Sequence, residues 1–457
     1  MHPHVHRSSA ARWRQAMLGN AVALAVSSCD TTEFLGVEDP DIINPSNVQS
    51  AAGANAVRLG AIARLTSASS GGESFLLLGG LFTDEWINGD SFIGRQEVDQ
   101  RTITVQNSFV TDATRNLHRA RLSAQQAVEL LAEFAPTAPG WQPAEMYFVQ
   151  AYVENLAAEH FCNGLVFSTV IDGAEVYGLP ITTADALARA LAHADSGLAL
   201  VTGTTASDVR VSNALKVVRG RILMNLSRPA DAATSVTGVP TNFKYEMFHA
   251  QTATSNQMWS FNNLAWRYSV GNSEGTNGIN FATAADPRLP VCVGGDAVCR
   301  TNGVTRTTRD DLTAPLHVQL VWPVRESSVA ITSGIEARMI EAEAQLRAQN
   351  SSGALATLNA ARTTVTGLTP LADAGSETAR VTQLFRERAI WLFGRGYRLG
   401  DLRRLVRQYN RAATAVFPVG AWHKGGNYGV DVNFPVPQAE QNNPNLPTGQ
   451  SCIDRNP

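Results

Sequence analysis

The sequence predicts a mostly α-helical protein in which helix hairpins are combined with loop-rich insertions and a few short strands. Long segments with apolar residues at steps of three and four indicate amphipathic helices. Two later segments each read as a helix, a short polar turn and a second helix rich in small residues. Residues 237–332 differ, because their many Asn, Gly, Thr and aromatic residues are typical of loops and short strands.

Three long helices are predicted in the first half of the chain. Residues 112–132 carry one apolar stripe at the helical period, and residues 143–160 begin with a proline, which suits a first helical turn. Residues 182–201 continue the pattern, with Thr182 or Thr183 as the expected N-cap.

Two helix hairpins are predicted over residues 214–236 and 335–362. Ser333 and Glu336 have the S-x-x-E spacing of a capping box at the start of the second hairpin. Small side chains within both hairpins allow paired helices to approach closely. This pattern resembles the tetratricopeptide unit, in which neighbouring pairs bury a continuous core, and it implies a right-handed helical scaffold.

The composition argues against several classes of protein. The chain has 457 residues and a formal net charge of −3, so it offers no strongly basic surface for nucleic acid. It contains no run of about 18 apolar residues, which a membrane-spanning helix requires. We therefore expect a globular protein that meets a membrane only through its N-terminus.

The N-terminus has the pattern of a secretory signal peptide, residues 1–28. Three arginines precede a short apolar stretch, residues 16–26, and then Ser27, Ser28 and Cys29. Val-Ser-Ser-Cys resembles the lipobox of bacterial lipoproteins, in which the cysteine is acylated, for example with palmitate. The resemblance implies a lipid on Cys29 followed by an extended leader that ends at residue 50. A disulfide or a free thiol at Cys29 is the alternative.

The other four cysteines are compatible with two disulfides in an exported chain. Cys292 and Cys299 bracket VGGDAV, whose glycines permit a tight reversal, so we favour a bond between them. A bond between Cys162 and Cys452 follows by elimination only. The chain has no C-x-x-C motif, so a zinc site is not favoured, and no metal or other cofactor is expected.

Aromatic residues flanked by planar polar side chains are candidates for binding a sugar. A pyranose ring packs its apolar face on an aromatic ring, while Asn, Asp or Arg side chains bond to its hydroxyl groups. The segments 83–92 and 256–270 fit this pattern. The candidate ligand-binding residues are Asp84, Trp86, Asn88, Asp90, Trp259, Trp266 and Tyr268. The alternative for each aromatic residue is packing in the core or within a loop.

Motifs for catalysis are weak, so we do not expect an enzyme. Residues 271–275 match G-x-S-x-G, but a nucleophile elbow needs a helix after the serine, whereas TNGINF follows here. Adjacent acids such as Asp84 and Glu85, or Asp310 and Asp311, do not establish the carboxylate separation of a glycosidase.

Five segments, in order along the chain, resemble the SusD/RagB family of outer-membrane nutrient-binding lipoproteins. They are FLGVEDPDIINPSNV (34–48), AAEHFCNGLVFS (157–168), IEARMIEAEAQLRAQNSSGALATLNAAR (335–362), LFRERAIWLFGRGYRLGDLRRL (384–405) and NFPVPQAEQNNPNL (433–446). The chain departs from the family pattern at Trp391, Leu392 and Phe393, which stand where the family usually has an acidic residue. Residues 237–332 show no such resemblance.

The resemblance implies a lipid-anchored protein on the extracellular side of the outer membrane, with no catalytic activity. It would bind an oligosaccharide, or less often a peptide, and deliver it to a TonB-dependent transporter of the SusC type. Helical regions over residues 51–236 and 333–457, the latter with an irregular tail, would hold a ligand-facing insertion over residues 237–332. The alternatives are a tetratricopeptide-like adaptor for peptides or proteins, and a secreted glycoside hydrolase.

Overall fold

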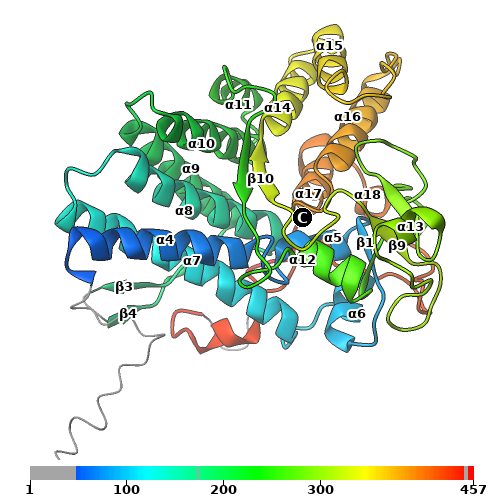
Figure 1. The fold of residues 1–457 in the computed structure, drawn as a ribbon, viewed down its shortest axis with the longest axis horizontal. Helices are drawn as coiled ribbons and strands as arrows, with labels where there is room; N and C mark the ends of the chain where they lie inside the picture. The colour runs from blue at the N-terminus through cyan, green and yellow to red at the C-terminus, as the bar shows by residue number, and fades with distance from the viewer. Residues whose placement is uncertain (1–47, 172–173, 447–450) are drawn as a thin grey trace, which may run out of the picture.

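The computed structural model describes residues 48–171, 174–446 and 451–457. The predicted signal peptide, Cys29 and most of the predicted leader lie outside these ranges. Within them, no helix is both long enough and apolar enough to cross a membrane. Figure 1 shows a helical body with a loop-rich region at its right-hand side.

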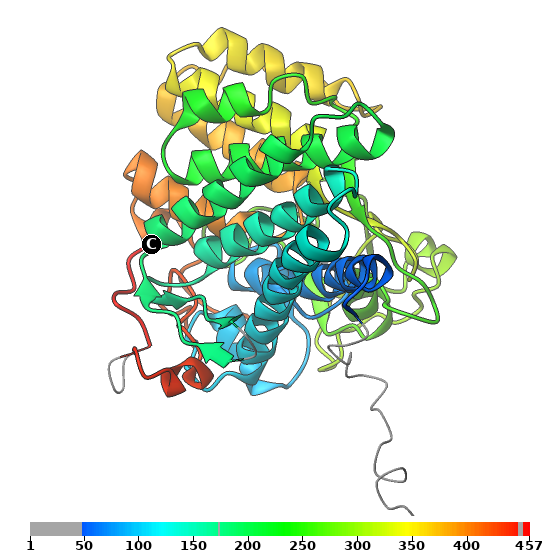
Figure 2. The ribbon, with the colours of Figure 1, turned by 90° about the vertical axis from the view of Figure 1, so that its left-hand side faces the viewer.

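The helical body is a series of helices that pack largely in chain order. They are α4 (Ala51–Ala68), α7 (Ser108–Phe134), α8 (Trp141–His160), α9 (Thr183–Leu200), α10 (Ala206–Asn225), α11 (Pro229–Ser235), α14 (Gly334–Arg347), α15 (Ser351–Arg362), α16 (Glu377–Trp391) and α17 (Arg398–Tyr409). Successive helices from α7 to α11 contact one another, α11 contacts α14, and α14 contacts α15. Figure 2 shows them as a stack whose colours run from cyan through green to yellow. The predicted mostly α-helical fold is confirmed.

Shorter elements form the loop-rich region and the connections. The short helices are α5 (Phe75–Phe82), α6 (Ile93–Gln100), α12 (Gln257–Trp259), the π-helix η1 (Ser260–Leu264), α13 (Ala297–Thr301), α18 (Ala413–Val416) and the 3-10 helix η2 (Gln438–Asn442). The strands form antiparallel pairs: β1 (Trp86–Asn88) with β7 (Tyr268–Val270), β2 (Leu165–Val166) with β5 (Pro180–Ile181), β3 (Thr169–Ile171) with β4 (Ala174–Val176), β6 (Lys244–Met247) with β10 (Val329–Ser333), and β8 (Val291–Val293) with β9 (His317–Gln319).

Local signals set the starts of two helices. Thr182 caps α9, because its hydroxyl accepts from the backbone N–H of Asp185 at 3.1 Å and the Asp185 carboxylate accepts from the Thr182 N–H at 3.3 Å. Ser333 caps α14 by accepting from the Glu336 N–H at 3.2 Å. The capping box predicted there is only half formed, since the Glu336 carboxylate accepts from the Tyr397 hydroxyl at 2.6 Å instead.

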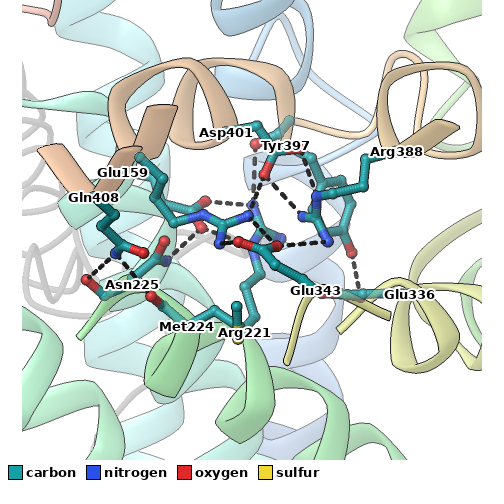
Figure 3. A network of polar contacts seen from close by, with 12 residues as sticks. Glu159, Arg221, Met224, Asn225, Glu336, Glu343, Arg388, Tyr397, Asp401 and Gln408 are labelled. Atoms are coloured by element: carbon teal, nitrogen blue, oxygen red, sulfur yellow. Dashed lines mark hydrogen bonds and ion pairs between the residues drawn. The ribbon is translucent and has the colours of Figure 1, made fainter. Parts of the chain in front are cut away.

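Buried polar contacts join the helices of the first half of the chain to those of the second (Figure 3). On α8, the Glu159 carboxylate accepts from Nε of Arg221, which lies on α10, at 2.8 Å. The Arg221 guanidinium lies 3.7 Å from the centroid of the Tyr397 ring, a cation–π contact. Tyr397 in turn bonds to Glu336 on α14. One chain of contacts therefore connects α8, α10, α14 and the segment before α17.

A second set of ion pairs continues this network through the C-terminal helices. Arg388 on α16 donates to Asp401 on α17 at 2.8 and 2.9 Å. Arg404, also on α17, donates to Glu343 on α14 at 2.5 and 3.0 Å and to Asp401 at 2.9 Å. These four side chains are at most 3% exposed, so each charge depends on its partners.

Two disulfides lie within the described residues. Cys162, just after α8, is bonded to Cys452 in the tail, and next to this bond the Asn163 amide donates to Asp454 at 2.9 Å. Cys292 and Cys299 close the turn between β8 and α13. The tail is therefore held to the helical body, and the loop-rich region has a covalent clasp of its own.

Replacing Glu343 by leucine should destabilise the protein by about 3–5 kcal/mol, because Arg404 is left as a buried charge that has lost its main partner. The measurement is urea unfolding followed by tryptophan fluorescence. Asp112→Ala is the control, since it breaks the exposed Arg115–Asp112 pair, whose expected contribution is about 0–1 kcal/mol. Equal losses in the two variants would contradict the importance of the buried network.

Candidate ligand-binding groove at Trp259

The seven side chains predicted to bind a ligand do not form one surface. Five of them are at most 1% exposed: Asp84, Trp86, Asn88, Asp90 and Tyr268. For Trp86 and Tyr268 this burial fits the alternative of packing in the core, and a part of the five in ligand binding stays a prediction. Trp259 and Trp266 are half-buried, and they remain the candidates that a ligand could reach.

Trp86 and Tyr268 are buried because apolar side chains pack around their rings, while the Tyr268 hydroxyl donates to Glu73 at 2.7 Å. Every residue of α5 (FLLLGGLF) is buried, and this helix leads directly into β1. The Trp86 ring packs against Phe393, with centroids 4.8 Å apart, and against Tyr268, with centroids 6.3 Å apart. A helix without a polar face is the signal in the sequence that β1 enters the core.

The polar residues of the same segment hold other parts of the protein in place. Asp84 accepts two hydrogen bonds from Arg398, at 2.7 and 2.8 Å. Asp90 pairs with Arg95, and the Asn88 side-chain oxygen accepts from the Asp90 N–H at 2.9 Å. These groups are already satisfied by the protein, which argues against a role in bonding to a ligand.

Glu85 differs from its neighbours because its buried carboxylate is only partly satisfied. One oxygen accepts from the Gly394 N–H at 3.0 Å, and the other has no partner among the described residues. Burial disfavours the charged form and raises the pKa of Glu85 to about 8, although the Gly394 bond and Arg398 act in the opposite direction.

Trp266 lies in the loop-rich region with one face covered. Its backbone has a φ of 57°, and the Arg306 guanidinium lies 4.4 Å from the centroid of its ring. The ring also packs on the small apolar core around the Cys292–Cys299 disulfide. Its part in ligand binding stays a prediction.

Trp259 lines a surface groove of about 440 Å³, which we name the Trp259 groove. This volume lies within the range of small-ligand sites. Its lining residues include Gln251, Trp259, Leu264, Val304, Arg325 and Glu326. Leu264 is 46% exposed, and the Arg325 guanidinium lies 5.5 Å from the centroid of the Trp259 ring. Among the described residues, no carboxylate forms an ion pair with Arg325.

Asparagine side chains fix the backbone that presents Trp259. Asn256 accepts from the Trp259 N–H at 3.1 Å, and its amide donates to the Ser327 carbonyl at 2.8 Å. The buried Asn262 donates to the carbonyls of Tyr268 and His317. These asparagines replace the backbone bonds that an irregular segment lacks. Trp259 immediately precedes the π-helix η1, a type of element often found at functional sites.

A stack of tetratricopeptide-like hairpins that carries a loop-rich insertion is the architecture of SusD-type proteins. Solved structures similar to this chain include SusD superfamily proteins, which match it over nearly their whole length. A SusD superfamily protein from Parabacteroides distasonis has a TM-score of 0.64 and 14% identity, covering 86% of this chain and 98% of its own. One from Bacteroides fragilis has the same TM-score and identity, covering 86% and 97%. One from Bacteroides vulgatus has a TM-score of 0.59 and 12% identity, covering 87% and 100%.

The chain therefore has the SusD fold, and the resemblance inferred from its five segments is confirmed at that level. No family sequence model matches the chain, and no curated protein matches it.

The pKa of Glu85 predicts a specific dependence of stability on pH. The folded protein keeps the Glu85 proton up to about pH 8, whereas the unfolded chain loses it near the ordinary value of 4.5. Between about pH 4.5 and pH 8, unfolding therefore releases the Glu85 proton. Because of this release, the free energy of unfolding falls as the pH rises through that range. Glu85→Gln cannot ionise, and its stability relative to wild type should increase from pH 5 to pH 8.

The measurement is urea unfolding of wild type and Glu85→Gln across that pH range. Glu133→Gln, on an exposed part of α7, serves as the reference for removing a carboxylate. A constant difference between wild type and Glu85→Gln at all pH values would show that Glu85 is ionised in the fold.

Proposed function

We propose that this protein is a SusD-type lipoprotein of the outer membrane that binds a nutrient oligosaccharide in the Trp259 groove. It would pass this ligand to a TonB-dependent transporter of the SusC type. The observation that carries the proposal is the Trp259 groove itself, because it combines a partly exposed aromatic face with polar groups on a SusD fold.

The chemistry of the groove suits a sugar ring. An indole offers a flat surface for the C–H face of a pyranose, and Gln251, Arg325 and Glu326 supply hydrogen-bond donors and acceptors for its hydroxyl groups. The exposed Leu264 and Val324 extend the apolar part of the wall. The groove lies in the region 237–332, which we infer to be the ligand-facing part.

A role in binding without catalysis is consistent with the position of the candidate acids. Asp84 and Glu85 lie in the core, and Asp84 is held by Arg398. Asp311 pairs with Lys424 at 2.6 Å. These carboxylates are therefore not arranged as a pair across the Trp259 groove, which is the arrangement that a glycosidase would need there.

Trp259→Ala should weaken the binding of the recognised polysaccharide about tenfold or more, which corresponds to about 1.4 kcal/mol for a lost aromatic contact. Affinity electrophoresis against a panel of polysaccharides measures this effect. Trp141→Ala is the matched control, because Trp141 is a half-buried tryptophan at the start of α8 and does not line the groove. Arg325→Met should also weaken binding, whereas Arg300→Met, on exposed α13, should not.

If a polysaccharide retards Trp259→Ala as strongly as it retards wild type, the result would contradict the Trp259 groove as the binding site. If no polysaccharide retards the protein while a transporter still co-purifies with it, the result would contradict a glycan ligand and favour a peptide. Hydrolysis of any sugar in the panel would contradict a role limited to binding.

Cys29→Ser should abolish the incorporation of labelled palmitate and release the protein from the membrane fraction, because the proposed anchor is the acylated cysteine. The measurement is radiolabelled palmitate in the immunoprecipitated full chain, with Cys452→Ser as a control that removes another cysteine. Unchanged labelling of Cys29→Ser would contradict lipidation at this residue.

A further inference from the structure

A second cavity, of about 340 Å³, lies where α7, α8 and α9 meet the segment from β2 to β3. We name it the α7–α9 cavity, and it is lined by residues that include Gln125, Tyr147, Gln150, Phe167, Arg189 and His193. It shares no lining residue with the Trp259 groove. Figure 1 shows α7, α8 and α9 together in the helical body.

Regular backbone geometry directs these side chains to one place. Residues alternate between two sides in an extended segment, so Phe167 and Thr169 line this cavity while Val166 and Ser168 line a different one. On α9, Arg189 and His193 are four residues apart and therefore share one helix face. Rigid elements thus form the cavity on three sides.

Gln150 is the side chain that most clearly points to a ligand. It is 3% exposed and lines the cavity, and among the described residues no hydrogen bond uses its side chain. Its amide atoms do not belong to the fully buried polar atoms that lack a partner, so the amide is accessible to a molecule in the cavity. Because an amide both donates and accepts, a hydroxyl group is the complementary partner for it.

The charged residues of the cavity are balanced by a buried carboxylate. Glu154 accepts from Nε of Arg189 at 2.7 Å and contacts Nδ1 of His193 at 2.7 Å. Since a carboxylate only accepts, Nδ1 carries a proton, and the Nε2 atom of a neutral ring is a hydrogen-bond acceptor. Glu129 adds a negative charge to the lining. The cavity therefore has no surplus of positive charge for an anion.

Aromatic rings complete the lining. The rings of Tyr147 and His193 lie 6.1 Å apart at an interplanar angle of 35°, and Phe167 is buried beside them. Gln125 is held in place, because its carbonyl oxygen accepts from Thr169 at 3.1 Å and its amide donates to Glu129 at 3.1 Å. Aromatic side chains, one fixed and one free amide, and an imidazole match a ring that carries several hydroxyl groups.

We infer that the α7–α9 cavity is a second binding site, for one neutral sugar ring, on the helical scaffold. A glycan that reaches both sites would bind more tightly than either site alone allows, because the second contact is intramolecular. The inference rests on the cavity and not on the Trp259 groove.

Saturation-transfer NMR of the full chain with the methyl glycosides of glucose, galactose, mannose and xylose tests the inference. At least one glycoside should give a signal that falls about fivefold or more in Gln150→Leu and in Tyr147→Leu. Gln126→Leu, on the exposed side of α7 and outside the cavity lining, should leave that signal unchanged. The signal should also persist in Trp259→Ala, which alters only the other site.

The absence of any glycoside signal, or signals of wild-type strength in both cavity variants, would overturn the second site. Loss of every signal in Trp259→Ala alone would also overturn it, while leaving the proposed function intact. If Trp259→Ala keeps both its glycoside signals and the polysaccharide affinity of wild type, the result would instead contradict the Trp259 groove as a binding site. Thermal unfolding checks each variant, and Tyr147→Leu, at a half-buried position, decides the test if Gln150→Leu does not fold.

Discussion

A full charge buried inside a protein is costly unless charged or polar partners satisfy it, and the ion pairs that meet this requirement organise the fold. Glu159 and Arg221 belong to the first half of the chain, whereas Glu343, Asp401 and Arg404 belong to the second. Exchanging any of these partners would leave a buried charge unpaired, which is costly. The Arg221–Tyr397 contact and the Tyr397–Glu336 hydrogen bond join the two sets of ion pairs, and they fix how α8 and α10 pack against α14 and the segment before α17 (Figure 3).

In the loop-rich region, buried backbone groups also need polar partners, and neutral side chains supply them. This region lacks long strands, so Asn256, Asn262 and Gln319 supply the hydrogen bonds that a sheet would otherwise provide. This arrangement lets an irregular segment present Trp259 at a fixed position. The loop-rich region can therefore vary in shape among proteins of this fold without any change in the helical body.

The helices could be predicted because their signals are local. The apolar stripe of residues 112–132 falls within α7, and Thr182 begins α9 as its hydroxyl and spacing indicate. The burial of Trp86 could not be read from residues 83–92 alone, because it depends on the wholly apolar α5 before them and on Phe393 and Tyr268, which are distant in sequence. Acids and asparagines next to an aromatic ring look alike whether they bond to a ligand or to the protein itself, so the candidate site was only partly predictable.

The Cys162–Cys452 disulfide has a consequence for the biogenesis of the protein. Its two cysteines are 290 residues apart in sequence, and disulfides persist in oxidising compartments rather than in the cytosol. If the chain is exported as proposed, the bond can close only after both cysteines have crossed to such a compartment, when almost all of the helical body has already been translocated. A chain that stalled during such export would keep a reduced Cys162 and an untethered tail, and this thiol would then be a chemical marker of incomplete translocation.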